Sequence, residues 1–196
     1  RCEAYNNLGF IHIRNGVLEL AEKCLQKSYE INPKYVPTLN NMVALYVNFQ
    51  NPEKALKYAK KSISLQPENP VCMNQHAKAL ILSGQLSKAI QILEELYKRF
   101  PSPPFRIDLS SAYRENGDIE KSNQIVKEEF EKNFRILEFF CVYAINPSHS
   151  LKKEQIKYYE DMVNNDAKND RSLIRDQIRL SETFFIYYKN KKDLKT

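Results

Sequence analysis

Side-chain amides recur at a fixed spacing in the first half of the sequence and could hydrogen-bond to a bound peptide. One series, spaced by 34 residues and then 33, consists of Asn7, Asn41, Gln75 and Asp108. A second series, one place earlier, consists of Asn6, Asn40, Asn74 and Ile107. Because an amide both donates and accepts hydrogen bonds, such a row can hold an extended peptide backbone without reading its side chains. The alternative is a row of solvated asparagines with no ligand.

The same period organises the rest of this region. Alanine recurs every 34 residues, as Ala21, Ala55 and Ala89, and so does proline, as Pro33, Pro67 and Pro101. Gly16 recurs as Gly84, with Gln50 at the same phase between them. A fixed period of this length predicts stacked structural repeats, each packed on its neighbours, in a solenoid.

Each repeat is predicted to be a pair of antiparallel helices. In the first repeat, apolar residues three and four apart predict helices over residues 3–14 and 18–31. Gly16 interrupts the pattern where a turn needs a positive φ, and Pro33 ends the second helix. Gly9 and Ala21 are small where the two helices would cross, so the backbones can approach closely.

The order of small, aromatic and proline positions resembles the tetratricopeptide repeat. In the first repeat this resemblance rests on Tyr5, Leu8, Gly9, Gly16, Ala21 and Pro33. It implies an all-α, right-handed α-solenoid of antiparallel helix pairs, with four repeats over residues 2–35, 36–69, 70–102 and 103–133. Residues 134–196 are expected to add a divergent helical pair and a terminal helix to the same solenoid.

The resemblance also implies where a partner would bind. In such solenoids the first helix of each pair lines a concave groove, and there the amide series resembles the asparagine ladder of the tetratricopeptide domain of O-linked N-acetylglucosamine transferase. The expected peptide-binding residues are Asn6, Asn7, Phe10, Asn40, Asn41, Ala44, Asn74, Gln75 and Lys78. A carboxylate clamp of the kind used by chaperone-binding relatives is not expected, because only Asn41 fits its pattern and the cations are missing.

No residue pattern indicates a reaction. The sequence has no GxSxG, HExxH or phosphate-binding glycine loop, and its 4 glycines are scattered. The 4 cysteines form no CxxC pair, so we expect reduced, packed thiols, a cytoplasmic protein and neither metal nor cofactor. His76 is expected to be packed in the core. The net charge of +6 is mild, and without a basic stripe carrying stacking aromatics it does not favour nucleic acid. No apolar run is long enough to cross a bilayer.

The C-terminal part carries a second, weaker resemblance. Tyr158, Asp176 to Leu180, and Lys192 to Leu194 resemble the segment that joins tetratricopeptide repeats to a sulfotransferase domain in bacterial fusion proteins. The aromatic terminal helix lacks a polar cap face, so we expect the natural protein to continue past Thr196. This helix could also pair with itself in a homodimer that hides Phe184, Phe185 and Tyr188.

Two functions remain open. The first is a non-catalytic scaffold that binds an extended peptide or partner helix in the concave groove. The second is the substrate-recognition arm of a larger, sulfotransferase-like transferase whose catalytic domain lies outside this chain.

Overall fold

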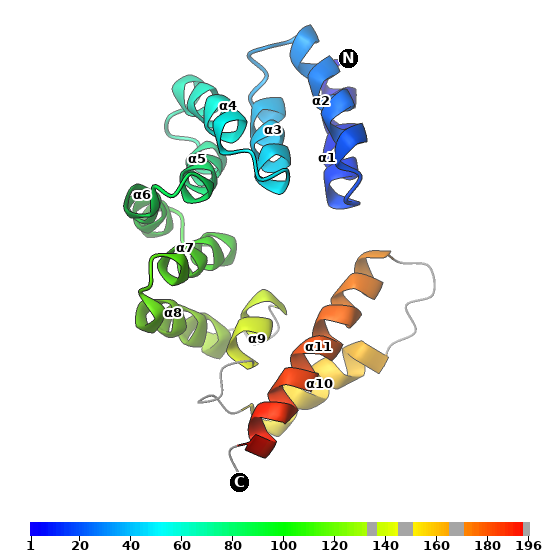
Figure 1. The fold of residues 1–196 in the computed structure, drawn as a ribbon, viewed down its shortest axis with the longest axis vertical. Coiled ribbons are helices and arrows are strands. Elements are labelled where there is room, and N and C mark those ends of the chain that lie inside the picture. Colours follow the sequence, from blue (N-terminus) through cyan, green and yellow to red (C-terminus); the bar gives the residue numbers. More distant parts are fainter. Residues whose placement is uncertain (133–136, 145–150, 165–170, 194–196) are drawn as a thin grey trace. The chain divides into compact units, whose positions relative to one another are not determined.

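The structure, a computed structural model, describes residues 1–132, 137–144, 151–164 and 171–193. Within these residues all regular secondary structure is helical, which confirms the predicted all-α class. The chain divides into two compact units, residues 1–118 and residues 119–196. Each unit is described by itself below (Figure 1).

The first unit is a stack of helical hairpins. Its helices are α1 (Cys2–Arg14), α2 (Leu18–Ile31), α3 (Val36–Asn48), α4 (Pro52–Leu65), α5 (Pro70–Leu82), α6 (Leu86–Arg99) and α7 (Pro103–Glu115). α1 packs on α2, α3 on α4 and α5 on α6, as the repeat pattern predicts. The first helices of the pairs also contact one another in succession, α1 with α3, α3 with α5 and α5 with α7.

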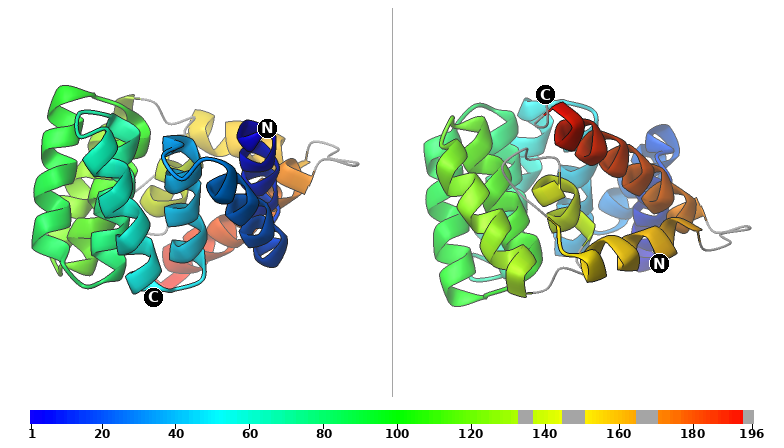
Figure 2. Two further views of the ribbon diagram at one scale, coloured as in Figure 1. Left: turned by 90° about the horizontal axis from the view of Figure 1, so that it is seen from above. Right: turned by 90° about the horizontal axis from the view of Figure 1, so that it is seen from below.

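This succession gives the unit two different sides. In Figure 1, α3, α5 and α7 lie on one side of the stack, and α4 and α6 lie on the other. The views from above and below show the same side-by-side order of these cyan and green helices (Figure 2). The side formed by α1, α3, α5 and α7 is called the inner face from here on.

The turns inside the hairpins repeat one geometry. Gly16 and Gly84 have positive φ, as predicted, and Gln50 adopts a φ of 53° at the same phase. After each turn a backbone N–H returns to a carbonyl near the end of the preceding helix, over 2.9 Å from Val17, Asn51 and Gln85. These bonds satisfy carbonyls that the helix end leaves without a partner. The repeated turn therefore follows from helix-end chemistry, and glycine is favoured there without being essential.

Small residues let the helices approach closely. Ala21, Ala55 and Ala89 are fully buried. At Gly9, an added Cβ would lie 2.7 Å from the side chain of Leu25, so α1 can cross α2 at this distance only with glycine there. The close crossing that Gly9 and Ala21 predict is therefore present.

The second unit is held together by aromatic side chains. It contains α8 (Ile119–Lys132), α9 (Leu137–Ala144), α10 (Lys153–Asn164) and α11 (Arg171–Asp193). Phe130 stacks on Tyr143 with ring centroids 4.3 Å apart, and Phe140 stacks on Tyr159 at 3.8 Å. Phe184 of α11 completes the cluster at 5.5 Å from Phe140.

The unit boundary falls between α7 and α8, the two helices expected to form the fourth repeat. The proposed repeat and domain limits at this point therefore stay predictions. The expected turn at residues 146–148 and the expected loop at 165–170 lie outside the described residues, as do His149 and Leu194.

The surface expected to form a homodimer is only partly exposed. Phe184 is buried in the aromatic cluster, whereas Phe185 and Tyr188 are exposed. Dimerisation through this helix stays a prediction.

Candidate functional site

The second amide series is buried, and its amides bind the protein itself. Asn6, Asn40 and Asn74 are each less than a tenth exposed. Asn41 Nδ2 donates to Asn6 Oδ1 over 2.8 Å, and Thr38 Oγ1 donates to the same oxygen over 3.3 Å. These bonds join α1 to α3, so Asn6 connects the first helices of two consecutive repeats.

Asn74 makes the equivalent connection between α5 and α7. Its Nδ2 donates to Asp108 Oδ2 over 2.8 Å, and Lys78 Nζ forms an ion pair with the same oxygen at 3.0 Å. Because this ion pair is partly buried, it is screened by salt less than a pair in open solvent. Asp108 therefore holds together a donor from an amide and a charge from a lysine on the inner face.

Asn40 is bonded to a different neighbour. Its Oδ1 accepts from Ser62 Oγ of α4 over 2.6 Å, and its Nδ2 faces Cys72 Sγ of α5 at 3.6 Å. Ser62 also donates to Cys72 over 3.1 Å. A serine on α2, Ser28, makes similar bonds to Thr38 Oγ1 at 2.6 Å and to the Cys2 carbonyl at 2.8 Å. A buried polar cluster thus recurs where each of the first two hairpins meets the next.

Two amide oxygens of α5 lack a hydrogen-bond partner. Asn74 Oδ1 and Gln75 Oε1 are both buried, and neither accepts a bond from any described residue. A buried acceptor without a donor costs free energy. Both atoms are therefore available to a donor that reaches α5.

Two hollows mark the inner face. One, of about 320 Å³, lies at the beginnings of α3 and α5 and is lined by Val36, Pro37, Asn40, Asn41, Gln66, Asn69 and Val71. The other, of about 540 Å³, lies toward the ends of α3, α5 and α7 and is lined by Val47, Gln50, Lys78, Ile81, Leu82, Asp108, Ser111 and Glu115. The second hollow, called the inner groove below, combines an apolar floor with charged and polar groups.

The structure thus separates the predicted peptide-binding residues. Asn40 and Asn41 line the smaller hollow, and Lys78 lines the inner groove. Asn7 and Phe10 are exposed on α1, and Ala44 is half-buried on α3. Peptide contact by these residues stays a prediction.

Sequence reasoning missed the apolar floor of the inner groove. Val47 and Ile81 lie 34 residues apart, so the period that identified the amides places them at equivalent positions. Tracing the period one turn beyond Ala44 and Lys78 would have found them. Asp108 was noticed only as a break in the amide series, whereas it binds both Asn74 and Lys78.

The remaining titratable groups indicate packing. His76 is half-buried, and burial, with a smaller effect of Lys60, lowers the pKa of its imidazole, which favours the neutral form. Cys2, Cys24, Cys72 and Cys141 are free thiols. Among the residues that the structure describes, no three His, Cys, Asp or Glu side chains are placed to hold a metal ion. The described helices include none with the length and apolar character needed to cross a bilayer.

Stacked helical hairpins with a hollowed inner face define a helical-repeat protein. Residues 3–35 and 36–69 match the sequence profile of the tetratricopeptide repeat. The chain therefore contains tetratricopeptide repeats, as its sequence pattern predicted.

Comparisons with known proteins agree on the fold. Over 65 residues, the chain is 34% identical to an uncharacterised protein, ycf37, of Pyropia yezoensis; the alignment covers 33% of this chain and 36% of that protein. The chain thus spans about a third of this curated relative.

Two solved structures are similar over more of the chain. A thermophilic tetratricopeptide repeat protein of Thermus thermophilus has a TM-score of 0.67 and 19% identity, over 74% of this chain and 80% of that one. A tetratricopeptide repeat protein of Parabacteroides merdae has a TM-score of 0.68 and 14% identity, over 92% and 71% of the two chains. At these identities the similarity establishes the fold. The kinship with sulfotransferase fusion proteins stays a prediction.

Proposed function

We propose that the first unit is a non-catalytic scaffold that binds an extended peptide or a partner helix along its inner face. The inner groove is the observation that carries this proposal. Its volume of about 540 Å³ lies within the range of sites that accept a few side chains. It also combines apolar and polar walls, which is what a peptide side chain next to a polar backbone requires.

The apolar floor supplies the affinity in this proposal. Val47, Ile81 and Leu82 are only partly buried and can lose further exposed area when a side chain covers them. Burial of apolar surface is favourable by roughly 25 cal/mol per Å². A peptide residue with an aliphatic or aromatic side chain is therefore the preferred occupant.

Polar groups at the wall supply the orientation. Lys78 and Asp108 hold each other in place, and Gln50 and Ser111 line the same hollow. An amide and a hydroxyl can hydrogen-bond to a peptide backbone of any sequence. The scaffold would therefore select an apolar anchor residue and accept varied neighbours.

The predicted amides take two roles in this proposal. Asn6, Asn40 and Asn74 stabilise the stack from inside, because their polar atoms face neighbouring helices. Asn7 and Asn41 lie nearer the surface and extend the contact toward α1 and α3. Gln75 would bind through its unpartnered Oε1 if a backbone N–H reached it.

The test is a peptide selection followed by titration. A random peptide library is selected on the full chain, and the peptides obtained are titrated against Ile81→Ser. The control is Ile92→Ser, which changes a half-buried isoleucine on α6, away from the inner face. We expect Ile81→Ser to weaken binding by about tenfold or more, as for an anchor position in an interface. Equal affinity for both variants would contradict the proposal.

A further inference from the structure

A third hollow lies outside the inner face, between the second helices of the first two repeats. Its volume is about 670 Å³ and its lining residues are Glu22, Lys23, Gln26, Lys27, Glu30, Tyr46, Lys54, Lys57 and Tyr58. Apart from Tyr46, all of them belong to α2 and α4. This hollow is called the α2–α4 pocket.

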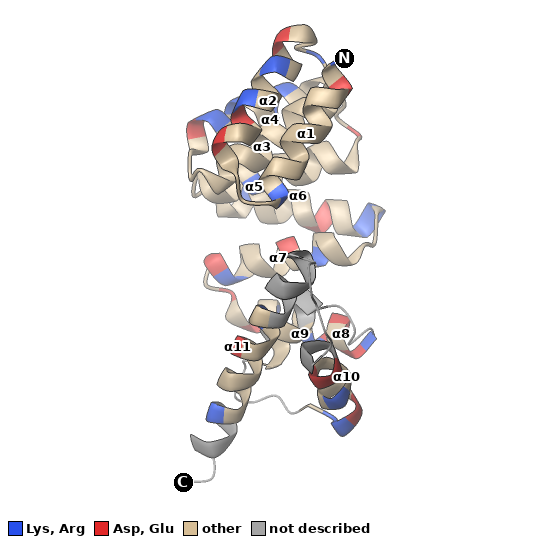
Figure 3. Cartoon of the chain, turned by 90° about the vertical axis from the view of Figure 1, so that its right-hand side faces the viewer, with Lys and Arg blue, Asp and Glu red and all other residues tan. Residues whose placement is uncertain are grey.

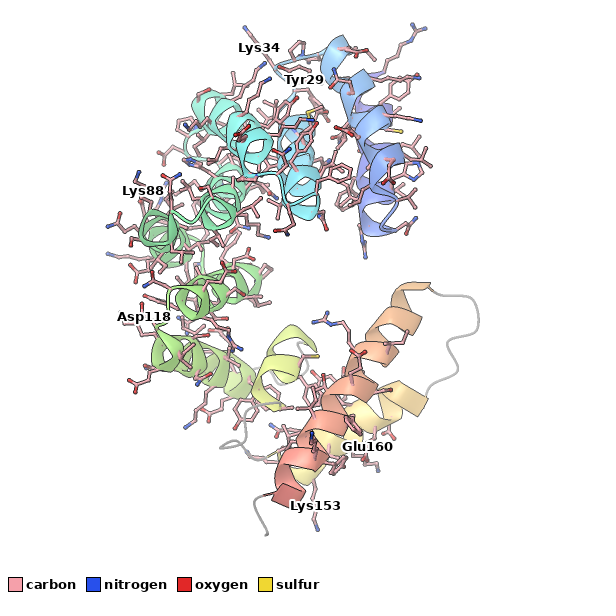
Figure 4. All side chains as sticks on the ribbon, in the orientation of Figure 1. Tyr29, Lys34, Lys88, Asp118, Lys153 and Glu160 are labelled. Atoms are coloured by element: carbon pink, nitrogen blue, oxygen red, sulfur yellow. The ribbon has the colours of Figure 1, made fainter. Side chains whose placement is uncertain are left out.

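The floor of the α2–α4 pocket is aromatic. Tyr46 and Tyr58 stack with ring centroids 5.6 Å apart and planes only 6° from parallel, and both side chains are buried. Tyr29 meets Tyr58 edge to face at 5.7 Å and lies on α2 (Figure 4). A hydrogen bond of 2.8 Å from Tyr46 Oη to Glu22 Oε1 fixes the first ring. The floor is thus a rigid π-surface, built before any ligand arrives.

The rim of the pocket is basic. Lys23, Lys27, Lys54 and Lys57 are exposed there, against the two carboxylates of Glu22 and Glu30. Basic and acidic positions colour the helices at this end of the unit (Figure 3). Glu22 is engaged by Tyr46 and by Lys54 Nζ at 3.7 Å, and Lys23 and Lys57 form no ion pair with any described residue. The excess charge of the rim is therefore positive and open to a ligand.

Two of the lysines lie close to the aromatic floor. Lys54 Nζ is 4.8 Å from the centre of the Tyr46 ring, and Lys57 Nζ is 5.6 Å from that of Tyr58. A cation over a ring face is attracted by its electron density, so the ammonium groups stay beside the rings. An anionic group bound by these lysines would therefore lie next to the π-surface.

The pocket is a property of these two repeats and does not follow from the fold alone. One period later, the positions of Tyr46 and Tyr58 are occupied by Leu80 and Ile92, and that of Glu22 by Leu56. Lys54 has an equivalent in Lys88, which is exposed on α6 (Figure 4). The aromatic floor is therefore absent around Lys88, although the charge remains.

We propose that the α2–α4 pocket binds an acidic peptide segment that carries an aromatic side chain. The aromatic ring would pack on Tyr46 and Tyr58, and the flanking carboxylates would pair with Lys23, Lys27 and Lys57. Charge complementarity and the π-surface both select this ligand. This site uses different helices from the inner groove, so it gives the scaffold a second, independent partner surface.

The probe is a short fluorescein-labelled peptide whose central Phe is flanked by Asp and Glu on both sides, titrated into the full chain by fluorescence polarisation. We expect Lys57→Glu to weaken binding about fivefold or more, the size of a single exposed charge contact. Lys88→Glu makes the same change of charge at the equivalent exposed region of the next repeat and should leave binding within about twofold. We expect Tyr58→Leu, which keeps an apolar side chain and removes the ring, to weaken binding also.

Three results would overturn the proposal. Equal losses from Lys57→Glu and Lys88→Glu would show attraction by net charge alone. Unchanged affinity when the central Phe of the peptide is replaced by Ala would remove the aromatic contact. Binding to phosphatidylserine vesicles without binding to the peptide would replace the peptide by a lipid surface.

Discussion

Asn41 Nδ2 lies 2.8 Å from Asn6 Oδ1, and this bond links the first helix of one repeat to the first helix of the next. The same oxygen accepts from Thr38 Oγ1. The amide series that looked like a ligand-binding row is therefore partly a set of internal connections. Substitutions at buried and exposed amides separate the two roles.

Replacing Asn6 by Ala removes the acceptor that both Asn41 and Thr38 use. Because these donors face the interior, we expect Asn6→Ala to lower the free energy of unfolding by about 1–3 kcal/mol. Asn7→Ala, on the exposed neighbour, should change it by less than about 0.5 kcal/mol. Urea denaturation monitored by circular dichroism measures both. Equal effects would show that the internal bond does not stabilise the stack.

Gly9 marks the closest approach of α1 and α2. A Cβ at this position would lie 2.7 Å from Leu25 Cδ2 and Cγ, so Gly9→Val forces the helices apart. We expect a loss of about 1–3 kcal/mol, the usual cost of overpacking. The matched control is Ala4→Val, on the exposed face of the same helix. A melting temperature for Gly9→Val equal to that of Ala4→Val would contradict the close crossing.

Gln50 adopts the left-handed conformation that Gly16 and Gly84 adopt in the other two hairpins. A residue with a Cβ pays roughly 1–2 kcal/mol for this conformation. Gln50→Gly should therefore stabilise the protein, by up to about 1 kcal/mol after the loss of chain entropy. A decrease in the free energy of unfolding would show that the bond from Gln50 Nε2 to the Val47 carbonyl matters more.

Two tyrosines make the unfolding free energy depend on alkaline pH. Burial, with a hydrogen bond to Glu94, raises the pKa of Tyr113 to about 12 from the usual 10.0. Burial and the bond to Glu22 also raise the pKa of Tyr46.

Between about pH 10 and pH 12 the unfolded chain loses these protons while the folded chain keeps them. The stabilisation is therefore complete below the pKa of the unfolded chain and decreases as the pH rises through the pKa of the folded state. We expect Tyr113→Phe to flatten part of this decrease in chemical denaturation over the alkaline range. An unchanged slope would contradict the raised pKa.

Much of the first unit could be predicted from its period. The spacing of Ala21, Ala55 and Ala89 placed the helix crossings, and Gly16 and Gly84 placed the turns. These features depend on local chemistry and on repeated contacts, both of which leave a mark in the sequence. The match of residues 3–69 to the tetratricopeptide repeat confirms this interpretation.

The hydrogen bonds of the candidate site could not be predicted in the same way. Asn6 and Asn7 are neighbours of the same type, yet only Asn6 is buried. Which amide faces the next helix depends on how α1 rotates against α3, and the period does not encode this rotation. The α2–α4 pocket was missed because its tyrosines come from two helices and do not repeat.

Peptide binding by the inner face is tested most directly by hydrogen–deuterium exchange of the full chain, with and without a peptide selected for binding. We expect slower exchange in α3, α5 and α7 around Val47, Ile81 and Asp108, with no change in α2 and α4. Slower exchange in α2 and α4 alone would place the peptide in the other pocket and would contradict binding at the inner face.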